Sequence, residues 1–336
     1  MVEDQHDPSI GGLPPPRATE RLFGHTSVWN ALVRARDGQR LHHGVLLSGP
    51  RGVGKATLAY AFAKVLISGA ADLEAALAHP VHRRIAGGAA QEFRRLTRGF
   101  TKEGRQRNVI AVEDVRALEP FLNQKLETGQ WRAVLIDAVD DLNASSANAL
   151  LKVLEEPGER TLFLLVSHNE GSILPTIRSR CVTHRMERLS DEDLRNALAD
   201  SSVETGAIDA ILPLAGGSVR RAIALADDDL VGAVSELHRL LDERQWSGEK
   251  AQGLSDRVAG RGSEDAYIEL TDALVGRLGS AAVEFGREGR GTNALRAAEA
   301  AALVNSDLAR MEEYGVDRRI AFRRALDVSH AALHAG

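Results

Sequence analysis

Short apolar runs alternate with longer amphipathic stretches along the first half of the chain. The runs that begin at Val45, Ala133 and Thr161 are only a few residues long and have no polar side, which is typical of strands buried on both faces. Strands that alternate with helices predict a parallel sheet covered by helices on both faces. We therefore expect an α/β domain over residues 21–189.

The pattern changes after Ser190, where apolar positions recur at helical spacing and no further strand is indicated. Ser190 and Asp193 have the spacing of a helix-capping sequence. We expect a small helical lid over residues 190–230 and an all-α block over residues 231–336. The amphipathic helices of that block either pack on one another or bind other subunits, and their pattern agrees with both.

A polar insertion interrupts the pattern over residues 68–108. Its later part, 92–107, is strongly basic, which favours a solvated loop, with contact to nucleic acid or a partner as the alternative. The pattern predicts that strands resume at Val109–Val112, followed by a helix through Val115 and Leu122.

The run SGPRGVGKAT at residues 48–57 nearly matches the phosphate-binding loop G-x-x-x-x-G-K-[ST]. Gly49, Gly52 and Gly54 allow a tight turn whose N–H groups point at phosphate oxygens. Lys55 adds a full positive charge at the start of a helix, where the helix dipole also favours anions. The run therefore predicts a nucleotide-binding type of fold.

The position after Lys55 departs from this motif. Ala56 stands where a hydroxyl would bind Mg²⁺, and Thr57 cannot replace it because one residue turns about 100° around a helix. The remaining loop is still able to hold phosphate. The sequence leaves open whether it binds ATP or ADP as a structural ligand or is only a Gly-rich turn.

The apolar run at 133–136 ends in Asp137, which in ATPases of this type helps to hold Mg²⁺. The next residue would be a glutamate that activates water, and here it is Ala138. Asp140 and Asp141 follow in the next loop and are no evident replacement. Because both the hydroxyl and the glutamate are missing, we do not expect efficient ATP hydrolysis at the chain's own site.

Three further motifs are distinctive as a set. RLHHG lies at 40–44, NALLKVLEEP at 148–157 and SRC at 179–181. Together with the phosphate loop, they make the chain resemble the clamp-loader branch of the AAA+ family over residues 21 to about 225. The resemblance implies an AAA+ P-loop domain, a helical lid and a C-terminal collar that holds subunits in a ring.

Within this family the chain resembles the non-motor, delta-prime group of bacterial subunits. Ser146–Ala149 matches that group's version of the helix, and the missing catalytic groups suit a stator. Many relatives carry four cysteines that form a zinc module, but Cys181 is the one cysteine of this chain. His79 and His82 are too few ligands to replace the module. We therefore expect no zinc and no other metal site.

The resemblance assigns a role to Arg180, which forms the SRC motif with Ser179 and Cys181. It implies an arginine finger that meets the γ-phosphate of a neighbouring subunit's ATP, where a planar guanidinium stabilises transition-state charge. The alternative is a surface or salt-bridged arginine. Arg220 matches the second sensor, whose arginine approaches the nucleotide from the lid, with a solvated arginine as the alternative.

The implied function is that of a non-catalytic clamp-loader subunit, whose assembly loads the sliding clamp on primed DNA for the DNA polymerase III holoenzyme. The implied partners are the motor (tau/gamma) and delta subunits, with the clamp and primer-template DNA reached through the assembly, and no cofactor is required. An ATPase motor acting at its own loop is a second hypothesis, opposed by Ala56 and Ala138. A stand-alone nucleic-acid-binding protein that uses Arg94, Arg95 and Arg98 is a third.

Charge and composition further restrict the possible functions and locations of the chain. The 336 residues carry a formal net charge of -5, so any contact with DNA must be local. No apolar run approaches the roughly 20 residues that span a membrane. Residues 1–20 contain several prolines and glycines, which predicts a disordered arm and no signal peptide. We expect a cytoplasmic protein.

Overall fold

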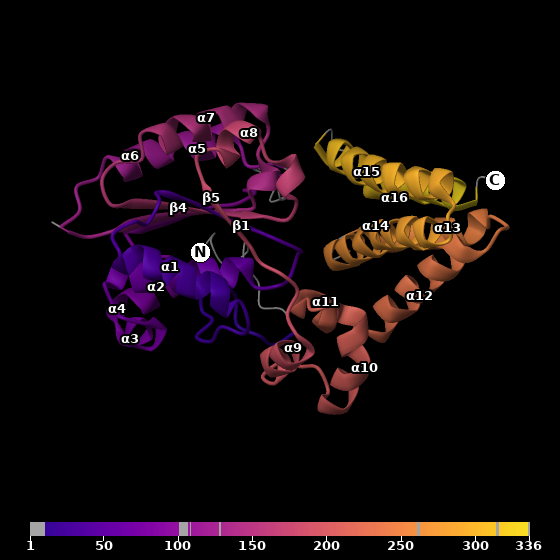
Figure 1. The fold of residues 1–336 in the computed structure, drawn as a ribbon, viewed down its shortest axis with the longest axis horizontal. Helices are drawn as coiled ribbons and strands as arrows, with labels where there is room; N and C mark the ends of the chain where they lie inside the picture. Colours follow the sequence, from indigo (N-terminus) through magenta and orange to yellow (C-terminus); the bar gives the residue numbers. More distant parts are fainter. Residues whose placement is uncertain are drawn as a thin grey trace. The chain divides into compact units, whose positions relative to one another are not determined.

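The computed structural model of the chain separates into two compact units, which meet in the sequence between Ile223 and Ala224 (Figure 1). The first unit holds every described strand, and the second is built of helices. The described residues are 11–100, 107, 109–127, 129–260, 263–313 and 316–334.

The first unit is built around a five-stranded sheet with the strand order β2-β3-β4-β1-β5, in which every pairing is parallel. All residues of β1 and β4 are buried, because these apolar strands lie inside the sheet with helices over both faces. The buried parallel strands predicted from the apolar runs are therefore confirmed. The strands are β1 (Gly44–Ser48), β2 (Phe93–Leu96), β3 (Arg132–Asp137), β4 (Thr161–Ser167) and β5 (Val182–Arg185).

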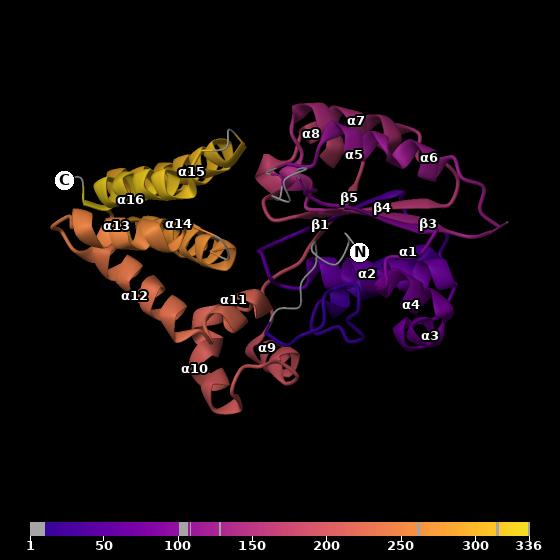
Figure 2. The same cartoon turned by 180° about the vertical axis from the view of Figure 1, so that it is seen from behind.

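Helices cover both faces of this sheet, as Figures 1 and 2 show. Because side chains alternate between the two faces of a strand, neighbours such as Leu46 and Leu47 belong to different apolar cores. One layer consists of α1 (Thr26–Asp37), α2 (Lys55–Ser68), α3 (Leu73–Ala78) and α4 (Pro80–Ala86). The other consists of α5 (Val112–Arg116), α6 (Leu118–Leu122), α7 (Ala144–Glu155) and α8 (Pro175–Arg178).

The strand next to β3 lies where we expected a solvated loop. β2 falls inside the basic segment 92–107 and pairs with β3 at one edge of the sheet. The strand predicted at Val109–Val112 is wrong, because Ile110 makes an isolated bridge there and α5 begins directly afterwards. The hydrophobic pattern missed β2 since an edge strand tolerates polar residues, here Arg94 and Arg95, between its two buried ends.

The predicted arm over residues 1–20 is described only in its second half, and residues 1–10 lie outside the described part. Gly11 O accepts a hydrogen bond from Ser202 N at 2.7 Å. Thr19 O accepts one from Lys64 Nζ at 3.1 Å. The described half of the arm is therefore joined to the rest of the first unit at Gly11 and Thr19.

Three helices follow the sheet in the region where we expected a lid: α9 (Asp191–Leu198), α10 (Thr205–Ala215) and α11 (Val219–Ala224). Ser190 Oγ accepts a hydrogen bond from Asp193 N at 3.1 Å, so the predicted helix cap is confirmed. The boundary between the two units falls at the end of α11.

The second unit packs its helices around an apolar core of its own, which includes Leu237, Leu274 and Phe322. Apolar positions at helical spacing predicted helices for this block, and each described element there is a helix. In the described ranges, no helix of either unit has the length and apolar character needed to cross a bilayer. The helices are α12 (Asp228–Asp242), α13 (Gly248–Arg257), α14 (Glu264–Arg287), α15 (Gly291–Glu313) and α16 (Arg318–His334).

A buried lysine in α2 leads to a prediction about stability and pH. Lys64 is fully buried, and burial lowers the pKa of its ammonium from 10.5 to about 8. Between those pH values the unfolded chain holds a proton that the folded chain has lost, so the wild type becomes more stable as pH rises through this window. We expect the wild type to gain about 2 kcal/mol relative to Lys64→Met between about pH 8 and pH 10.

Urea unfolding of both proteins across this pH range measures the difference. The same substitution at Lys125, which is exposed, serves as the control for removal of a lysine. Parallel pH profiles for the wild type and Lys64→Met would show that Lys64 keeps its solution protonation in the folded chain.

Candidate functional site

The phosphate-binding loop joins the carboxyl end of β1 to the start of α2 at Lys55. Gly49 N donates a hydrogen bond to Ser167 O at 3.3 Å, which ties the loop to the end of β4. Gly52 and Gly54 have φ angles of 74° and 102°, a conformation that residues with a side chain rarely adopt. The motif therefore forms the strand–loop–helix turn that it predicts.

The lysine of the motif contacts its own loop. Lys55 Nζ donates hydrogen bonds to Gly49 O at 2.7 Å and to Pro50 O. The residue is 3% exposed, and burial lowers the pKa of its ammonium to about 8. Ala56 and Thr57 follow in the first turn of α2 and are partly buried. The positive charge of the motif is present at the loop, whereas Ala56 supplies no metal ligand.

The start of α11 packs against the phosphate loop. Val219 N donates a hydrogen bond to Gly52 O at 3.0 Å. A Cβ on Gly52 would lie 2.3 Å from Ser218 Oγ and 2.7 Å from Arg220 Cβ. Ser218 Oγ also accepts a hydrogen bond from Arg221 N at 3.2 Å. The structure thus brings Arg220, which we singled out as a second-sensor residue, beside the loop.

Asp137 ends β3 and forms an ion pair with Arg95 of β2. Arg95 Nη2 and Asp137 Oδ2 are 2.9 Å apart, and each side chain is 16% exposed. Nearby, Arg98 Nε lies 3.4 Å from Asp141 Oδ2. Burial raises the pKa of Asp141 to about 6, although Arg98 acts in the opposite direction. Both arginines come from the basic segment 92–107, where the sequence pattern predicted a solvated loop.

Asp140 holds the segment that follows β4. Its carboxylate accepts hydrogen bonds from Ser167 Oγ at 3.1 Å, from His168 N at 2.8 Å and from Asn169 N at 3.1 Å. Ser167 is the last residue of β4, and His168 and Asn169 follow it directly. No local sequence pattern gives Asp140 a role, because its partners are distant along the chain, but its hydrogen bonds make it the residue that positions this segment.

Asp137, Asp140 and Asp141, which form the acid end of the site, do not make a Mg²⁺ site. Ala56 has no side-chain oxygen, Asp137 is paired with an arginine, and Asp140 accepts three hydrogen bonds. His79 caps α4 and His82 lies against a glutamate. Over the part of the chain that the structure describes, no three His, Cys, Asp or Glu side chains are placed to hold a metal ion. The geometry therefore disagrees with the metal-dependent chemistry of an active P-loop site.

Arg180 lies at the opposite end of the sheet from the phosphate loop. A Cβ on Gly44, the first residue of β1, would be 2.6 Å from Arg180 O. Val182 then pairs with Val45 at the start of β5. Because β1 has five residues, and a strand rises about 3.3 Å per residue, the two ends are separated by on the order of 15 Å. The Arg180 side chain therefore does not reach the chain's own phosphate loop.

The SRC turn presents a partly exposed guanidinium. Arg180 Nη2 lies 2.6 Å from Glu155 Oε1 at the end of α7, and the two side chains are 35% and 50% exposed. Arg180 Nη1 and Ser179 Oγ both donate hydrogen bonds to Thr176 O at 3.0 Å. Burial raises the pKa of the Cys181 thiol to about 12, so Cys181 stays protonated and acts as a packing residue.

The three arginines of the nucleic-acid hypothesis contact other residues of the first unit. The Arg94 guanidinium lies 5.0 Å from the centre of the Phe121 ring and donates hydrogen bonds to backbone carbonyls. Arg95 and Arg98 form the ion pairs with acid residues described above. Arg94 is exposed, whereas Arg95 and Arg98 are largely buried, so the three side chains do not form a continuous basic surface for nucleic acid.

Comparison with known families agrees with the motifs. The family described as "DNA polymerase III, delta subunit" matches residues 24–190, a range that includes the phosphate loop, Asp137 and the SRC turn. The chain belongs to the clamp-loader branch of the AAA+ family. The AAA+ fold expected from the resemblance is therefore confirmed for this clamp-loader chain.

Two curated relatives are different subunits of DNA polymerase III. Subunit delta′ of Pseudomonas aeruginosa is 35% identical over 206 residues, which cover 57% of this chain and 57% of that protein. Subunit tau of Escherichia coli is 30% identical over 292 residues, which cover 79% of this chain and 43% of that protein. The chain therefore spans about half the length of these relatives.

Among solved structures, a DNA polymerase III gamma subunit-related protein from Thermotoga maritima aligns with 91% of this clamp-loader chain and 99% of its own chain. The sequence identity is 16% and the TM-score is 0.37. A likeness at this level is too distant to bear on function.

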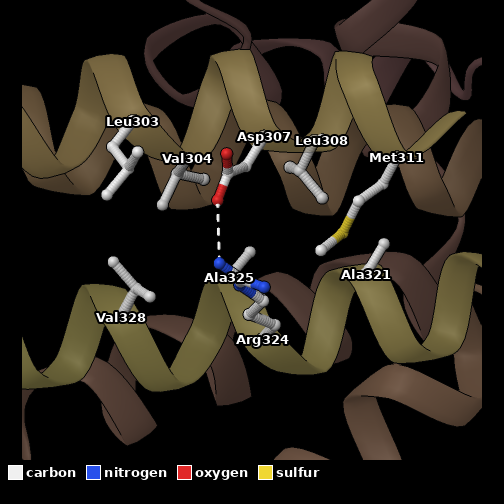
Figure 3. Close-up of a pocket in the computed structure, with 9 residues that line it drawn as sticks. All are labelled: Leu303, Val304, Asp307, Leu308, Met311, Ala321, Arg324, Ala325 and Val328. Carbon is white, nitrogen blue, oxygen red and sulfur yellow. Dashed lines mark ion pairs between the residues drawn. The ribbon is translucent and has the colours of Figure 1, made fainter. Parts of the chain in front are cut away.

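A groove in the second unit runs between α15 and α16 (Figure 3). Leu303 and Val328 are among its apolar lining residues, and Arg324 Nη2 lies 3.4 Å from Asp307 Oδ2 across it. Its cavity volume is about 10 Å³, which is no more than one water molecule requires. The groove is therefore a small gap between two packed helices, and it is too small for a small-molecule ligand.

The contact between the loop and α11 predicts unequal effects of two glycine substitutions. Gly52→Ala and Gly54→Ala both place a side chain at positive φ, but only the first meets close neighbours, since no atom lies within 4 Å of a Cβ on Gly54. We expect Gly52→Ala to cost about 1–3 kcal/mol more than Gly54→Ala in the free energy of unfolding. Urea unfolding of both variants measures this, and equal losses would contradict the packing of α11 on the loop.

Proposed function

We propose that this chain is a stator subunit of the bacterial clamp loader and that Arg180 acts in trans on the ATP of a neighbouring motor subunit. The observation that carries the proposal is the polarity of β1. Arg180 lies beside Gly44 at the amino end of this strand, and the phosphate loop follows Ser48 at the carboxyl end. An arginine that is out of reach of its own loop is available to a second subunit's nucleotide.

The chain's own loop supports a role without hydrolysis. Ala56 and Ala138 lack the groups that bind Mg²⁺ and activate water, and Asp137 is paired with Arg95. The proposed role requires no cofactor and no zinc. An ATP or ADP held by the loop that ends at Lys55 would be a structural ligand and not a substrate.

In the proposed mechanism, the neighbour's ATP brings the γ-phosphate to the Arg180 guanidinium. The planar group donates hydrogen bonds to the phosphate oxygens and stabilises the charge that spreads over them during transfer. Hydrolysis in the neighbour removes this contact. The difference in contact between the two states is what biases the assembly toward or away from its clamp-opening form.

The proposed partners follow from this role. Arg180 would face a motor (tau/gamma) subunit, and the delta subunit would belong to the same ring. The helices of the second unit would form the collar that holds the subunits together, and the sliding clamp and primer-template DNA would be bound by the whole assembly. This role places the chain in the bacterial cytoplasm, beside DNA polymerase III.

A motor role is the second candidate, because the match to the E. coli tau subunit covers 79% of this chain, against 57% for delta′. That role requires ATP hydrolysis at the loop that ends at Lys55. Ala56, Ala138 and the pairing of Asp137 argue against it. We therefore keep the stator role as the first proposal.

Removal of the finger should lower the ATP turnover of the reconstituted clamp loader in the presence of clamp and primed DNA. An arginine finger contributes roughly 10³–10⁵ in rate at the site that it serves, so Arg180→Ala should silence the adjoining site while the other sites continue. Arg180→Lys should not restore the rate, because lysine lacks the planar fork. Phosphate release measures turnover, and size-exclusion chromatography confirms that the subunits still assemble.

Arg178 offers a matched control, since it is exposed and lies two residues before Arg180. Arg178→Ala should leave both turnover and assembly unchanged. Wild-type turnover in the complex that carries Arg180→Ala would remove the finger hypothesis. ATP turnover by the isolated chain that Lys55→Ala abolishes would establish the motor role instead.

The ion pair of Arg180 with Glu155 makes a further prediction. Exposed ion pairs contribute about 0.2–1 kcal/mol, so Glu155→Gln should change the turnover of the complex by no more than about five-fold. Glu156→Gln, at the exposed neighbouring position, is the control. A loss as large as that of Arg180→Ala would mean that Glu155 itself contacts the reacting nucleotide.

A further inference from the structure

Two arginines form ion pairs with carboxylates at and just after the end of β3, and one of these carboxylates, Asp137, stands where a P-loop ATPase holds its metal. Arg95 Nη2 is 2.9 Å from Asp137 Oδ2, and Arg98 Nε is 3.4 Å from Asp141 Oδ2. All four side chains are largely buried, with exposed fractions between 16% and 24%. Because salt and water screen buried charges only weakly, each arginine acts as a close counter-charge for its carboxylate.

The other charges around this space are mainly positive. Burial keeps the pKa of His168 well below its ordinary value, and four cations act on it in the same direction. Three carboxylates face these cations, so a divalent cation would enter a region in which positive charge already predominates. The cations are Lys55, Arg51, Arg220 and Arg98, joined by Arg95, and the carboxylates are Asp137, Asp140 and Asp141.

We infer that Arg95 and Arg98 take the permanent place of Mg²⁺ at the acid end of this site, so that the fold of the site is independent of divalent cations. Asp137 is then an ion-pair partner and not a metal ligand. Ala56 agrees with this, because a site without Mg²⁺ needs no side-chain hydroxyl at that position. The inference concerns the chain's own site and holds whether or not Arg180 serves a neighbour.

A double-mutant cycle measured with and without Mg²⁺ tests the inference on the full chain. The wild-type thermal midpoint should be the same in EDTA and in excess MgCl₂. Arg95→Ala and Asp137→Asn should each lower the midpoint, equally in both buffers, because each leaves one buried charge without its partner. The double variant should unfold no lower than Arg95→Ala alone, since removing both partners costs less than removing one.

Arg94 provides the matched control, because it lies on the same strand but stacks on Phe121 and has no acid partner at this site. Arg94→Ala and Asp137→Asn should therefore have additive effects on the midpoint. A Mg²⁺-dependent rise in the wild-type midpoint that Asp137→Asn abolishes would overturn the inference. Additive effects of Arg95→Ala and Asp137→Asn would overturn it as well. Arg95→Gln replaces the alanine variant in the cycle if that variant does not fold.

Discussion

The parallel pairing of β1 with β4 and β5 is the constraint on which both functional ends of the first unit depend. The strands of a parallel sheet share one direction, so the segment before a strand and the segment after it lie at opposite sides of the sheet. We call these sides the amino edge and the carboxyl edge, after the strand ends that form them. For β1 this places the phosphate loop at the carboxyl edge. The same register places the SRC turn, which leads into β5, beside Gly44 at the amino edge. One short strand therefore separates the phosphate loop from Arg180, the group that the proposed role offers to another subunit.

The two edges differ in how firmly their charges are held. At the carboxyl edge, Lys55 donates to carbonyls of its own loop, α11 packs on Gly52, and the buried Asp137 is paired with Arg95. Breaking a buried pair on one side costs several kcal/mol, about 3–5 in measured cases. At the amino edge, Arg180 and Glu155 are partly exposed, and such pairs contribute about 0.2–1 kcal/mol. In the proposed role, a phosphate would displace Glu155 from Arg180 at little cost, whereas the pair at Asp137 would persist.

The sequence predicted those parts of the fold that leave a local signal. β1, β3 and β4 are buried on both sides and appear as apolar runs, and the phosphate loop has a motif of its own. β2 has no such signal, because at the sheet edge its polar residues can serve a neighbour on the next strand. Arg95 is 42 residues from Asp137 along the chain, and no periodicity reports a pairing of that kind. The same holds for Asp140, whose partners lie 27 to 29 residues away.

The loss of the metal ligand and the presence of the arginine have a common physical consequence. A site that hydrolyses ATP must change its charge in every cycle, as nucleotide and metal arrive and leave together. A guanidinium that is covalently part of β2 cannot leave, so in the inferred arrangement Asp137 keeps its partner and its packing. The proposed finger benefits from such a site, because an arginine stabilises a neighbour's transition state best when its supporting sheet does not change shape during that neighbour's cycle. Rigidity at the carboxyl edge thus complements the exchangeable contact of Arg180 at the amino edge.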